Sequence, residues 1–246
     1  MDPLLILSFF VIAGVYASVG FGGGTSYLAV MSVLAVSFEV MRPAALLCNI
    51  VVVTGGSYVF YKEGLLSMKQ SWPFLLSSVP LAFVGGYYPI QEKSFFYLLG
   101  VSLIAGSLLL WFYDRWVILE KNPSRADNIP LNLVMGGGIG FLSGLVSIGG
   151  GIFLSPILHF LRWDTARRIS ALASVFILAN SISGLLGQWS RSASLSLDFV
   201  LPLLVAVFAG GYIGSRWGAR KFNPIHIRRI TAILILVAGI NILINH

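Results

Sequence analysis

The stretch Gly20-Phe21-Gly22-Gly23-Gly24-Thr25 interrupts a long apolar run, 4–36, and the stretch Ser147-Ile148-Gly149-Gly150-Gly151-Ile152 interrupts a second one, 131–161. The two glycine triplets lie 127 residues apart in a chain of 246. A glycine inside a helix costs about 1 kcal/mol relative to alanine. A broken backbone within a bilayer is tolerated only where protein or a water-filled cavity surrounds it. Paired breaks at matching places in two halves are typical of a membrane binding site.

The composition predicts an integral membrane protein. Of all residues 57% are hydrophobic and only 10% are charged, whereas a soluble domain carries about 25% charged residues. The net charge of +7 suits basic loops that face an anionic leaflet. A nucleic-acid-binding protein would need a soluble fold with a basic stripe, and the sequence indicates neither. We therefore expect the lipid bilayer as the partner, and a location in the cell (inner or plasma) membrane.

The apolar runs divide the chain into two similar halves. Runs long enough to span a bilayer, about 17 to 25 residues, follow the two long ones at 44–61, 73–90, 94–113, 171–188, 199–217 and 226–244. The sequence therefore predicts an all-α protein with a first membrane repeat at 1–113, a cytoplasmic linker at 114–130 and a second repeat at 131–246. Each repeat is a glycine-broken re-entrant hairpin followed by three transmembrane helices.

A second glycine correspondence joins the third runs of the two halves. Phe83-Val84-Gly85-Gly86-Tyr87 matches Phe208-Ala209-Gly210-Gly211-Tyr212 at a spacing of 125 residues. Small residues in transmembrane helices often serve close helix packing. We interpret these two pairs in that way, and keep a functional interpretation for the triplets alone.

The positive charges predict how the long runs behave. If each long run crossed the membrane once, the 16 Lys and Arg residues would divide ten to six between the faces. If each long run returns to its own side, thirteen gather on one face and only Arg42, Lys93 and Arg191 remain on the other. Cytoplasmic loops carry the Lys/Arg excess, which favours the hairpins. Each half then crosses three times, so the second half is inverted and both termini lie outside.

The hairpins predict an anion site near the membrane midplane. The returning helices begin near Thr25 and Ile152, and their first N–H groups lack intrahelical partners and carry the positive end of the helix dipole. Two such N-termini that converge would bind an anion without a buried Lys or Arg. Hydroxyl and amide side chains, Ser147 included, would complete it. The predicted substrate-binding residues are Gly22, Gly23, Gly24, Thr25, Asn49, Gly149, Gly150, Gly151, Ile152, Ser174 and Asn180.

Other chemistry has little support in the sequence. No HExxH motif, paired intramembrane carboxylates or Cys/His cluster is present, so we predict no metal, no cofactor and no enzyme activity. The histidines His159, His226 and His246 lie at run edges, out of reach of a buried nucleophile. A scaffold protein would not require duplicated helix breaks. No intramembrane carboxylate is available to carry a coupling proton, while Na⁺ coupling through backbone carbonyls stays open.

These residues resemble the TauE/SafE sulfite exporter family, also called the TSUP family of membrane transporters. The resemblance covers nearly the whole chain. It rests on Gly149-Gly150-Gly151-Ile152-Phe153-Leu154-Ser155-Pro156-Ile157-Leu158 with Ala171-Leu172-Ala173-Ser174, and on Gly22-Gly23-Gly24 with Arg42-Pro43-Ala44-Ala45-Leu46-Leu47-Cys48-Asn49. The first half has Ala29 where the second has Pro156, so the two hairpins are expected to differ.

The resemblance implies export of a small sulfur-containing anion, such as sulfite, sulfoacetate or a related organosulfonate, by alternating access. The residues themselves indicate only a small anion. The alternative is ion-coupled uptake of a sulfur compound. The oligomeric state is not predicted.

Overall fold

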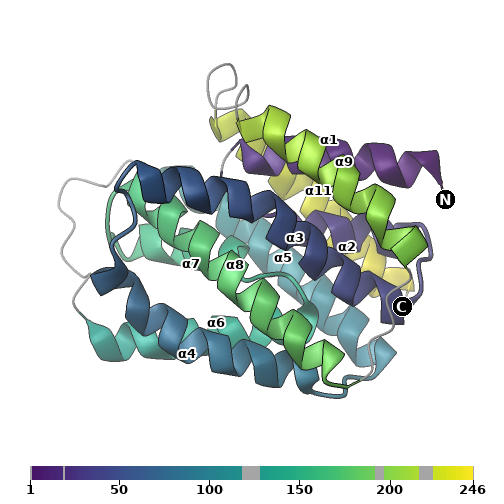
Figure 1. Ribbon diagram of the computed structural model, residues 1–246, viewed down its shortest axis with the longest axis horizontal. Helices are drawn as coiled ribbons and strands as arrows, with labels where there is room; N and C mark the ends of the chain where they lie inside the picture. Colours follow the sequence, from purple (N-terminus) through teal and green to yellow (C-terminus); the bar gives the residue numbers. More distant parts are fainter. Residues whose placement is uncertain (1, 19, 118–127, 192–196, 216–223, 246) are drawn as a thin grey trace.

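The computed structural model describes residues 2–18, 20–117, 128–191, 197–215 and 224–245, and the elements within them are helices. The helices of the first half are α1 (Pro3–Ala17), α2 (Gly24–Val33), α3 (Phe38–Lys62), α4 (Met68–Tyr87) and α5 (Glu92–Val117). Those of the second half are α6 (Ile129–Val146), α7 (Gly151–Phe160), α8 (Ala166–Trp189), α9 (Leu197–Ile213) and α11 (Pro224–Asn245). Figure 1 shows them packed into one bundle.

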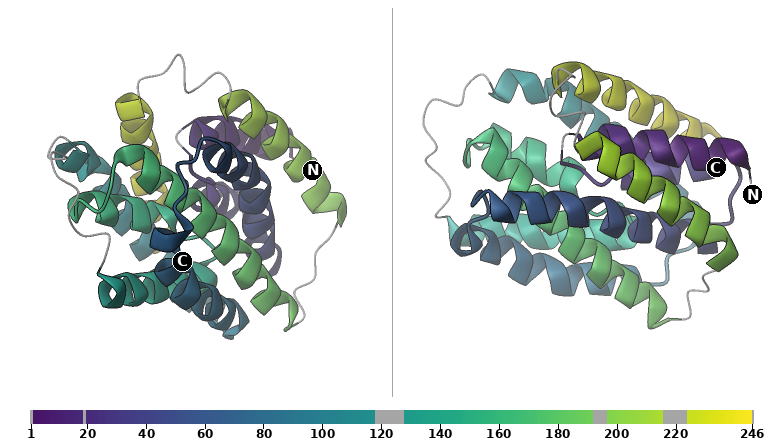
Figure 2. Two further views of the ribbon diagram at one scale, coloured as in Figure 1. Left: turned by 60° about the vertical axis from the view of Figure 1, so that its left-hand side comes forward. Right: turned by 45° about the horizontal axis from the view of Figure 1, so that its top comes forward.

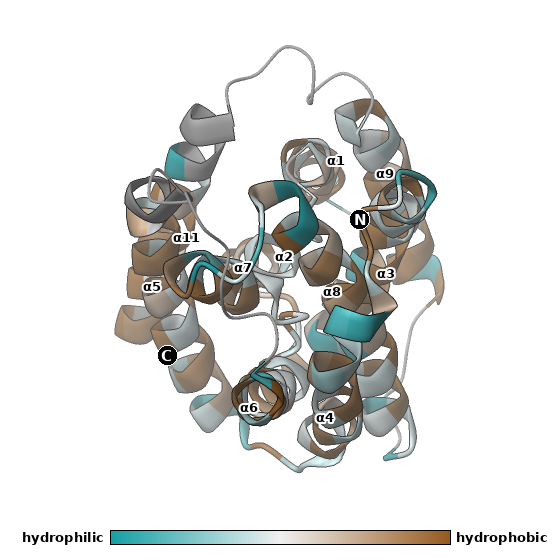
Figure 3. Cartoon of the chain, turned by 90° about the vertical axis from the view of Figure 1, so that its left-hand side faces the viewer, coloured by the Kyte–Doolittle hydropathy of each residue, from teal (hydrophilic) through white to brown (hydrophobic). Residues whose placement is uncertain are grey.

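The helices have the length and surface of a multi-pass membrane protein. In the described part of the chain, α3, α5, α6 and α8 are long and apolar enough to cross a bilayer. Large apolar side chains point outward, with Leu7 59%, Val134 74% and Phe208 65% exposed. Figure 3 shows hydrophobic residues along helices all around the bundle. Such an apolar exterior is what a lipid environment requires.

Both long apolar runs break at the predicted glycines, and the four resulting helices begin in two ways. Helices α1 and α6 have side-chain caps, since Asp2 Oδ1 accepts from the Leu4 N–H at 2.9 Å and Asn128 Oδ1 from the Leu131 N–H at 3.2 Å. Helices α2 and α7 instead follow glycines in the left-handed region, Gly23 (φ 87°) and Gly150 (φ 82°). A β-carbon disfavours that conformation, so glycine is required there.

The contacts between helices follow one pattern in both halves. Helix α4 packs against α6 and α8, and α9 packs against α1 and α3. Helix α5 packs on α7, while α11 packs on α2. Across the middle, α3 lies against α8 and α5 against α11. Each of these contacts therefore has a counterpart in which the two halves exchange roles.

Close helix packing explains most of the second glycine correspondence. A β-carbon at Gly85 would lie 2.8 Å from the Leu145 nitrogen and against the Phe141 carbonyl. One at Gly86 would meet the Gly184 carbonyl, and one at Gly210 the Phe10 carbonyl. These three glycines let neighbouring backbones approach closely. Gly211 is packed less tightly, because a β-carbon there would lie 3.7 Å from Val52, an ordinary van der Waals distance.

The ends of the elements indicate how the chain crosses the bundle. The start of α1 and the end of α11 lie at the same end of the molecule, at the right in Figure 1 and in the right panel of Figure 2. At the other end, Arg167 at the start of α8 pairs with Glu63 after α3, at 3.2 Å. Between these two residues lie α4, α5 and the α6–α7 pair. If α4 and α5 each run the length of the bundle once, an α6–α7 pair that returns to the end where it began would bring these two residues together.

Two helix boundaries differ from the limits of the apolar runs. Helix α5 continues to Val117, so the first residues of the expected linker 114–130 are helical, and α6 begins at Ile129. Residues 118–127 of that linker lie outside the described residues. Helix α3 begins at Phe38, ahead of the run at 44–61, which places Arg42 inside a helix. Charged residues end an apolar run but do not end a helix, because helix propensity tolerates them.

Candidate functional site

The two glycine breaks meet around one buried side chain, Asn49 of α3. We call residues 20–24 the first tip and residues 147–151 the second tip. The Asn49 Nδ2 donates to the Ile148 carbonyl of the second tip at 3.2 Å. A β-carbon at Gly22 or at Gly24 in the first tip would run into the same amide. Asn49 is fully buried and thus lies between the tips of the two halves.

The two helices that leave the tips present uncapped N-termini. Neither α2 nor α7 has a side-chain cap. The hydrogen-bonding of α2 starts at the Tyr27 N–H, which donates to the Gly23 carbonyl at 3.0 Å, and that of α7 at the Phe153 N–H, which donates to Gly150 at 3.1 Å. The earlier N–H groups carry the positive end of each helix dipole. Both helix starts are buried, so these groups are positive dipoles inside the protein.

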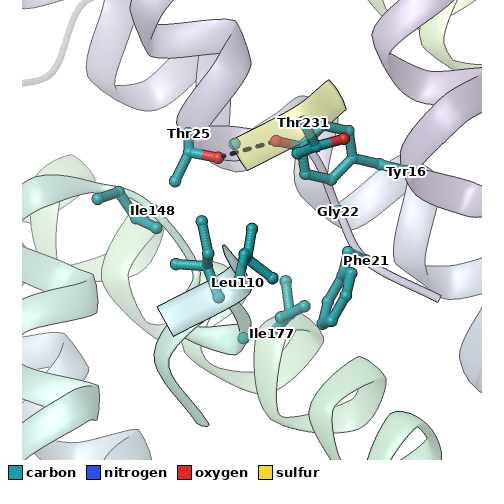
Figure 4. A pocket seen from close by; sticks show the side chains of 12 residues that line it. Tyr16, Phe21, Gly22, Thr25, Leu110, Ile148, Ile177 and Thr231 are labelled. Carbon is teal, nitrogen blue, oxygen red and sulfur yellow. Dashed lines mark hydrogen bonds between the residues drawn. The ribbon is translucent and has the colours of Figure 1, made fainter. Parts of the chain in front are cut away.

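A small cavity lies between the helix starts (Figure 4). Its volume is ≈ 20 Å³, which is room for about one water molecule. Its lining residues are Tyr16, Phe21, Gly22, Gly23, Gly24, Thr25, Leu110, Ile148, Gly151, Ile152, Ile177 and Thr231. Among these there is no Asp, Glu, His, Lys or Arg, so the positive character of the lining comes from backbone dipoles and hydroxyls.

Hydroxyl groups form the polar side of this cavity. The Tyr16 Oη lies 2.8 Å from the Ser26 Oγ and 3.4 Å from the Thr25 Oγ1. Figure 4 shows Tyr16, Thr25 and Thr231 on one side of the cavity, with Ile177, Leu110 and Phe21 below them. A hydroxyl can donate to an anion or accept from a neighbour, so this side can adapt to an oxygen-rich ligand.

The structure brings six of the eleven predicted site residues to the cavity wall. They are Gly22, Gly23, Gly24, Thr25, Gly151 and Ile152. Asn49 lies directly behind the wall, in contact with both tips. Gly149 (φ 86°) and Gly150 turn the chain, and a β-carbon at Gly150 would meet Phe176 at 2.9 Å and Ile139 at 3.0 Å. These two glycines shape the second tip without lining the cavity.

The remaining predicted residues lie deeper in the bundle. Ser174 and Asn180 of α8 are fully buried, and neither is among the lining residues. The Ser174 Oγ would lie 3.3 Å from a β-carbon at Gly56 of α3. Neither amide atom of Asn180 has a hydrogen-bond partner in the described part of the chain. The Ser147 Oγ, another predicted donor, accepts from the Gln188 Nε2 at 2.8 Å and so holds the second tip to α8.

Several lining residues were missed by the sequence interpretation. Tyr16 lies at the end of the entering helix and Thr231 in the last run, more than 200 residues away. The others are apolar: Phe21, Leu110, Ile148 and Ile177. No motif marks them, because an apolar residue in an apolar run carries no periodic signal for a cavity. Phe21 and Ile148 are exceptions that the sequence could have indicated, because Phe21 lies between Gly20 and Gly22 and Ile148 directly precedes Gly149.

Ile177 of α8 has the place at the second tip that Asn49 has at the first. In the first tip, Gly22 and Gly24 face Asn49; in the second, Gly151 faces Ile177, and Gly149 faces both Ile177 and Asn49. The positions of the helix starts lead to the same pairing. Helix α3 begins at residue 38 and α8 at residue 166, so residue 49 of α3 and residue 177 of α8 lie equally far into their helices. The sequence analysis selected Ser174 and Asn180 on α8 and did not include this apolar counterpart.

Comparisons with known proteins relate the chain to membrane transporters. The family model described as sulfite exporter TauE/SafE matches residues 5–242. The probable membrane transporter protein y4hK of Sinorhizobium fredii is 33% identical over 240 residues, 97% of each chain. A probable membrane transporter protein of Bacillus subtilis, YjnA, is 23% identical over 99% of this chain and 100% of its own. One from Methanocaldococcus jannaschii is 26% identical over 60% of this chain and 56% of its own. No solved structure matches the chain significantly.

Proposed function

Because the chain belongs to the TauE/SafE sulfite exporter family, a family of membrane transporters, we propose that it exports a small sulfur-containing anion by alternating access. The substrate class is sulfite, sulfoacetate or a related organosulfonate. The observation that carries the proposal is the meeting of two buried, uncapped helix N-termini, α2 and α7, around Asn49. Such N-termini attract negative charge, and they come from the two halves of the chain.

The proposed architecture is two inverted repeats, 1–113 and 131–246, joined by a cytoplasmic linker. Three observations support it: the exchanged helix contacts of the two halves, the Arg167–Glu63 ion pair, which fits a re-entrant α6–α7, and the termini at one end of the bundle. Inverted repeats supply two related arrangements of the same elements, which is the usual basis of alternating access. Both termini are then outside.

Reporter fusions and single cysteines test this topology. The chain has one cysteine, Cys48, and it is buried, so cysteines introduced at the loops can be labelled with little background. Labels at Ser37 and Ser190 should react from outside, and a label at Ser67 only from inside. A cytoplasmic C-terminus together with an outside N-terminus would contradict the inverted arrangement.

The anion is held by the N–H groups that begin α2 and α7, with hydroxyl groups beside them. The cavity at this point, ≈ 20 Å³, suits one water and is too small for an anion with three oxygen atoms. Binding therefore requires the tips or the side chains over them to move apart. A closed site between two halves is the intermediate that alternating access passes through.

Export follows from the charge of the substrate. An anion that leaves a cell with a negative interior gains about 2.3 kcal/mol per charge for each 100 mV. Since no carboxylate, histidine or basic residue is among the lining residues, we expect the substrate to move without a proton exchanged with the cavity wall. The membrane potential is then the driving force.

A substrate panel tests the function. Purified protein in lipid vesicles is assayed for counterflow of labelled sulfite against sulfite, sulfate, thiosulfate and C2 sulfonates. We expect exchange with at least one sulfur oxyanion or sulfonate, and none with uncharged sugars or with cations. Counterflow of none of these anions would refute the function. Accumulation that depends on an imposed Na⁺ or H⁺ gradient would instead support ion-coupled uptake.

A further inference from the structure

Arg42 is a basic side chain that reaches the end of α6 beside the second tip, and it has an unusual environment. It lies on α3, seven residues before Asn49. Seven residues are two helical turns, about 10 Å along the axis, and return to the same helix face. The Arg42 Nη2 donates to the Leu145 carbonyl near the end of α6 at 3.1 Å. Arg42 is therefore located on the route from the tips to the end of the bundle where α1 starts.

Two aromatic rings lie against the guanidinium of Arg42, and not all of its N–H groups have a hydrogen-bond partner. It lies over the rings of Phe38 and Phe95, at 5.4 and 5.5 Å from their centroids. Its Nε is buried and has no hydrogen-bond partner in the described part of the chain. A guanidinium offers a fork of parallel N–H groups that fits two oxygens of one oxyanion. Part of that fork is thus oriented, desolvated and unoccupied by protein.

No carboxylate offsets the charge of Arg42. Within the described residues, neither Arg42 nor Arg191 after α8 has a carboxylate in salt-bridge distance, and the charge of Arg191 acts on Arg42 as well. The other end of the bundle differs, because Arg167 pairs with Glu63 at 3.2 Å and Arg168 with Asp164 at 3.4 Å. The unpaired Nε of Arg42 and the absence of a paired acid there favour an anion as its ligand.

We infer that Arg42, with Arg191, forms a second anion site on the outer side of the tips, which binds a small oxyanion through two of its oxygens. The inference rests on the proposed function, which makes this end the exit for the substrate. The anion leaves the helix N-termini, moves about two helical turns along α3 and is received by Arg42 before release. The second half has no such site, since the position on α8 that corresponds to Arg42 is Ser170.

The test compares the two faces of the membrane. Right-side-out and everted vesicles expose the outer and the inner face, and the half-saturating concentration of external sulfite for counterflow is measured in each. Arg42→Gln should raise that concentration about tenfold in right-side-out vesicles and by less than twofold in everted ones. Arg191→Gln should act in the same direction with a smaller effect. Lys93→Gln, which removes the third cation of that end, is the matched control and should change neither value.

Two outcomes overturn the inference. One is an equal shift on both faces, which would assign Arg42 to the central site or to folding. The other is no shift at all. Arg42→Lys keeps the charge without the fork, and should give an intermediate, outer-face-only shift if Arg42→Gln does not fold.

A binding measurement separates this inference from the proposed function. If the wild type shows no counterflow, the function fails, and the site is judged by the melting temperature of the protein in detergent. Sulfite should raise that temperature in the wild type and in Lys93→Gln, and less in Arg42→Gln. An equal rise in all three overturns the site. A rise with short-chain phosphatidylglycerol but not with sulfite would identify a lipid phosphate as the ligand and also overturn it.

Discussion

The two glycine tips have the same backbone design and opposite side-chain surroundings. Each turns through left-handed glycines and opens into an uncapped helix. The first tip faces the amide of Asn49, which is fixed by its hydrogen bond to the second tip. The second faces Ile177, a buried apolar side chain, although Asn49 also lies 3.0 Å from a β-carbon at Gly149. The repeated backbone supplies the dipoles, while the side chain nearest the flanking glycines is a polar amide at Gly22 and Gly24 and an apolar group at Gly149 and Gly151.

The largest effect should come from a β-carbon in the first tip. At Gly24 it would collide with Asn49 and approach the Ile148 carbonyl to 2.9 Å, and neither can move without breaking the bond between the tips. At Gly151 it would collide with the Cδ1 and Cγ1 atoms of Ile177, an apolar side chain whose displacement breaks no hydrogen bond. We expect Gly24→Ala to lower sulfite counterflow at least about 100-fold and Gly151→Ala about tenfold, roughly 1.4 kcal/mol per factor of ten.

A double variant sharpens this comparison. Ile177→Ala removes the side-chain atoms nearest a β-carbon at Gly151, so Gly151→Ala with Ile177→Ala should recover most of the lost flux. If both single glycine variants transport normally while remaining folded, the glycines serve packing alone and the anion site is elsewhere.

The next effect tests the amide itself. Asn49→Ile makes the two tips alike and leaves the buried Ile148 carbonyl without its donor. An unsatisfied buried acceptor costs about 1–3 kcal/mol, so counterflow should fall about 30-fold and the melting temperature should drop. Ile177→Leu, which changes the shape of the opposite residue and keeps its polarity, should retain at least half of the flux. Equal losses in the two variants would contradict a special role for Asn49.

Glycine pattern alone could not separate the breaks from the packing sites. Gly136-Gly137-Gly138 is a third triplet, yet α6 continues through it. A β-carbon at Gly136 would lie 2.6 Å from the Phe74 carbonyl of α4, and one at Gly140 2.5 Å from the Ser78 Cα. Those glycines are helical because α4 packs directly on them. The tips were predictable because they recur at the same place in both halves, while the packing partner of Gly136 is known only from the fold.

Helix packing gives a prediction about stability. Gly85→Ala would press a β-carbon into the backbone of α6, with the Leu145 nitrogen at 2.8 Å. Overpacking of this kind costs about 1–3 kcal/mol. Gly138→Ala, in the same helix pair, meets nothing within 4 Å and should be neutral or stabilising by up to about 1 kcal/mol. Melting temperatures in detergent should separate the two, and a stable Gly85→Ala protein would contradict the packing role.

The hydroxyl side of the cavity was beyond sequence reasoning for a physical reason. Thr231 reaches the cavity because α11 packs on α2, and Tyr16 comes from α1, which also packs on α2, so contacts between the two ends of the chain bring these hydroxyls together. Asn49 could be predicted because it stands among apolar residues in a run. Its counterpart Ile177 could not, since it differs in no visible way from the other apolar residues of α8.

The smallest effect is expected from these hydroxyls. Thr231→Val keeps the shape and removes one donor, and Tyr16→Phe removes the Oη that lies 2.8 Å from Ser26. A hydrogen bond between membrane helices contributes about 0.6 kcal/mol on average. Each variant should therefore raise the half-saturating sulfite concentration about threefold with little change in maximal rate. A loss above 100-fold from Thr231→Val would move the centre of the site away from the tips.

The voltage dependence of flux tests the central claim most directly. Vesicles loaded with sulfite are clamped by a K⁺ gradient with valinomycin, at matched internal and external pH. If backbone dipoles and hydroxyls alone hold the anion, its movement carries net charge, so efflux should rise as the loaded interior is made more negative and should respond only weakly to a pH gradient after correction for sulfite ionisation. Efflux that ignores the voltage and follows a pH or Na⁺ gradient would contradict the account.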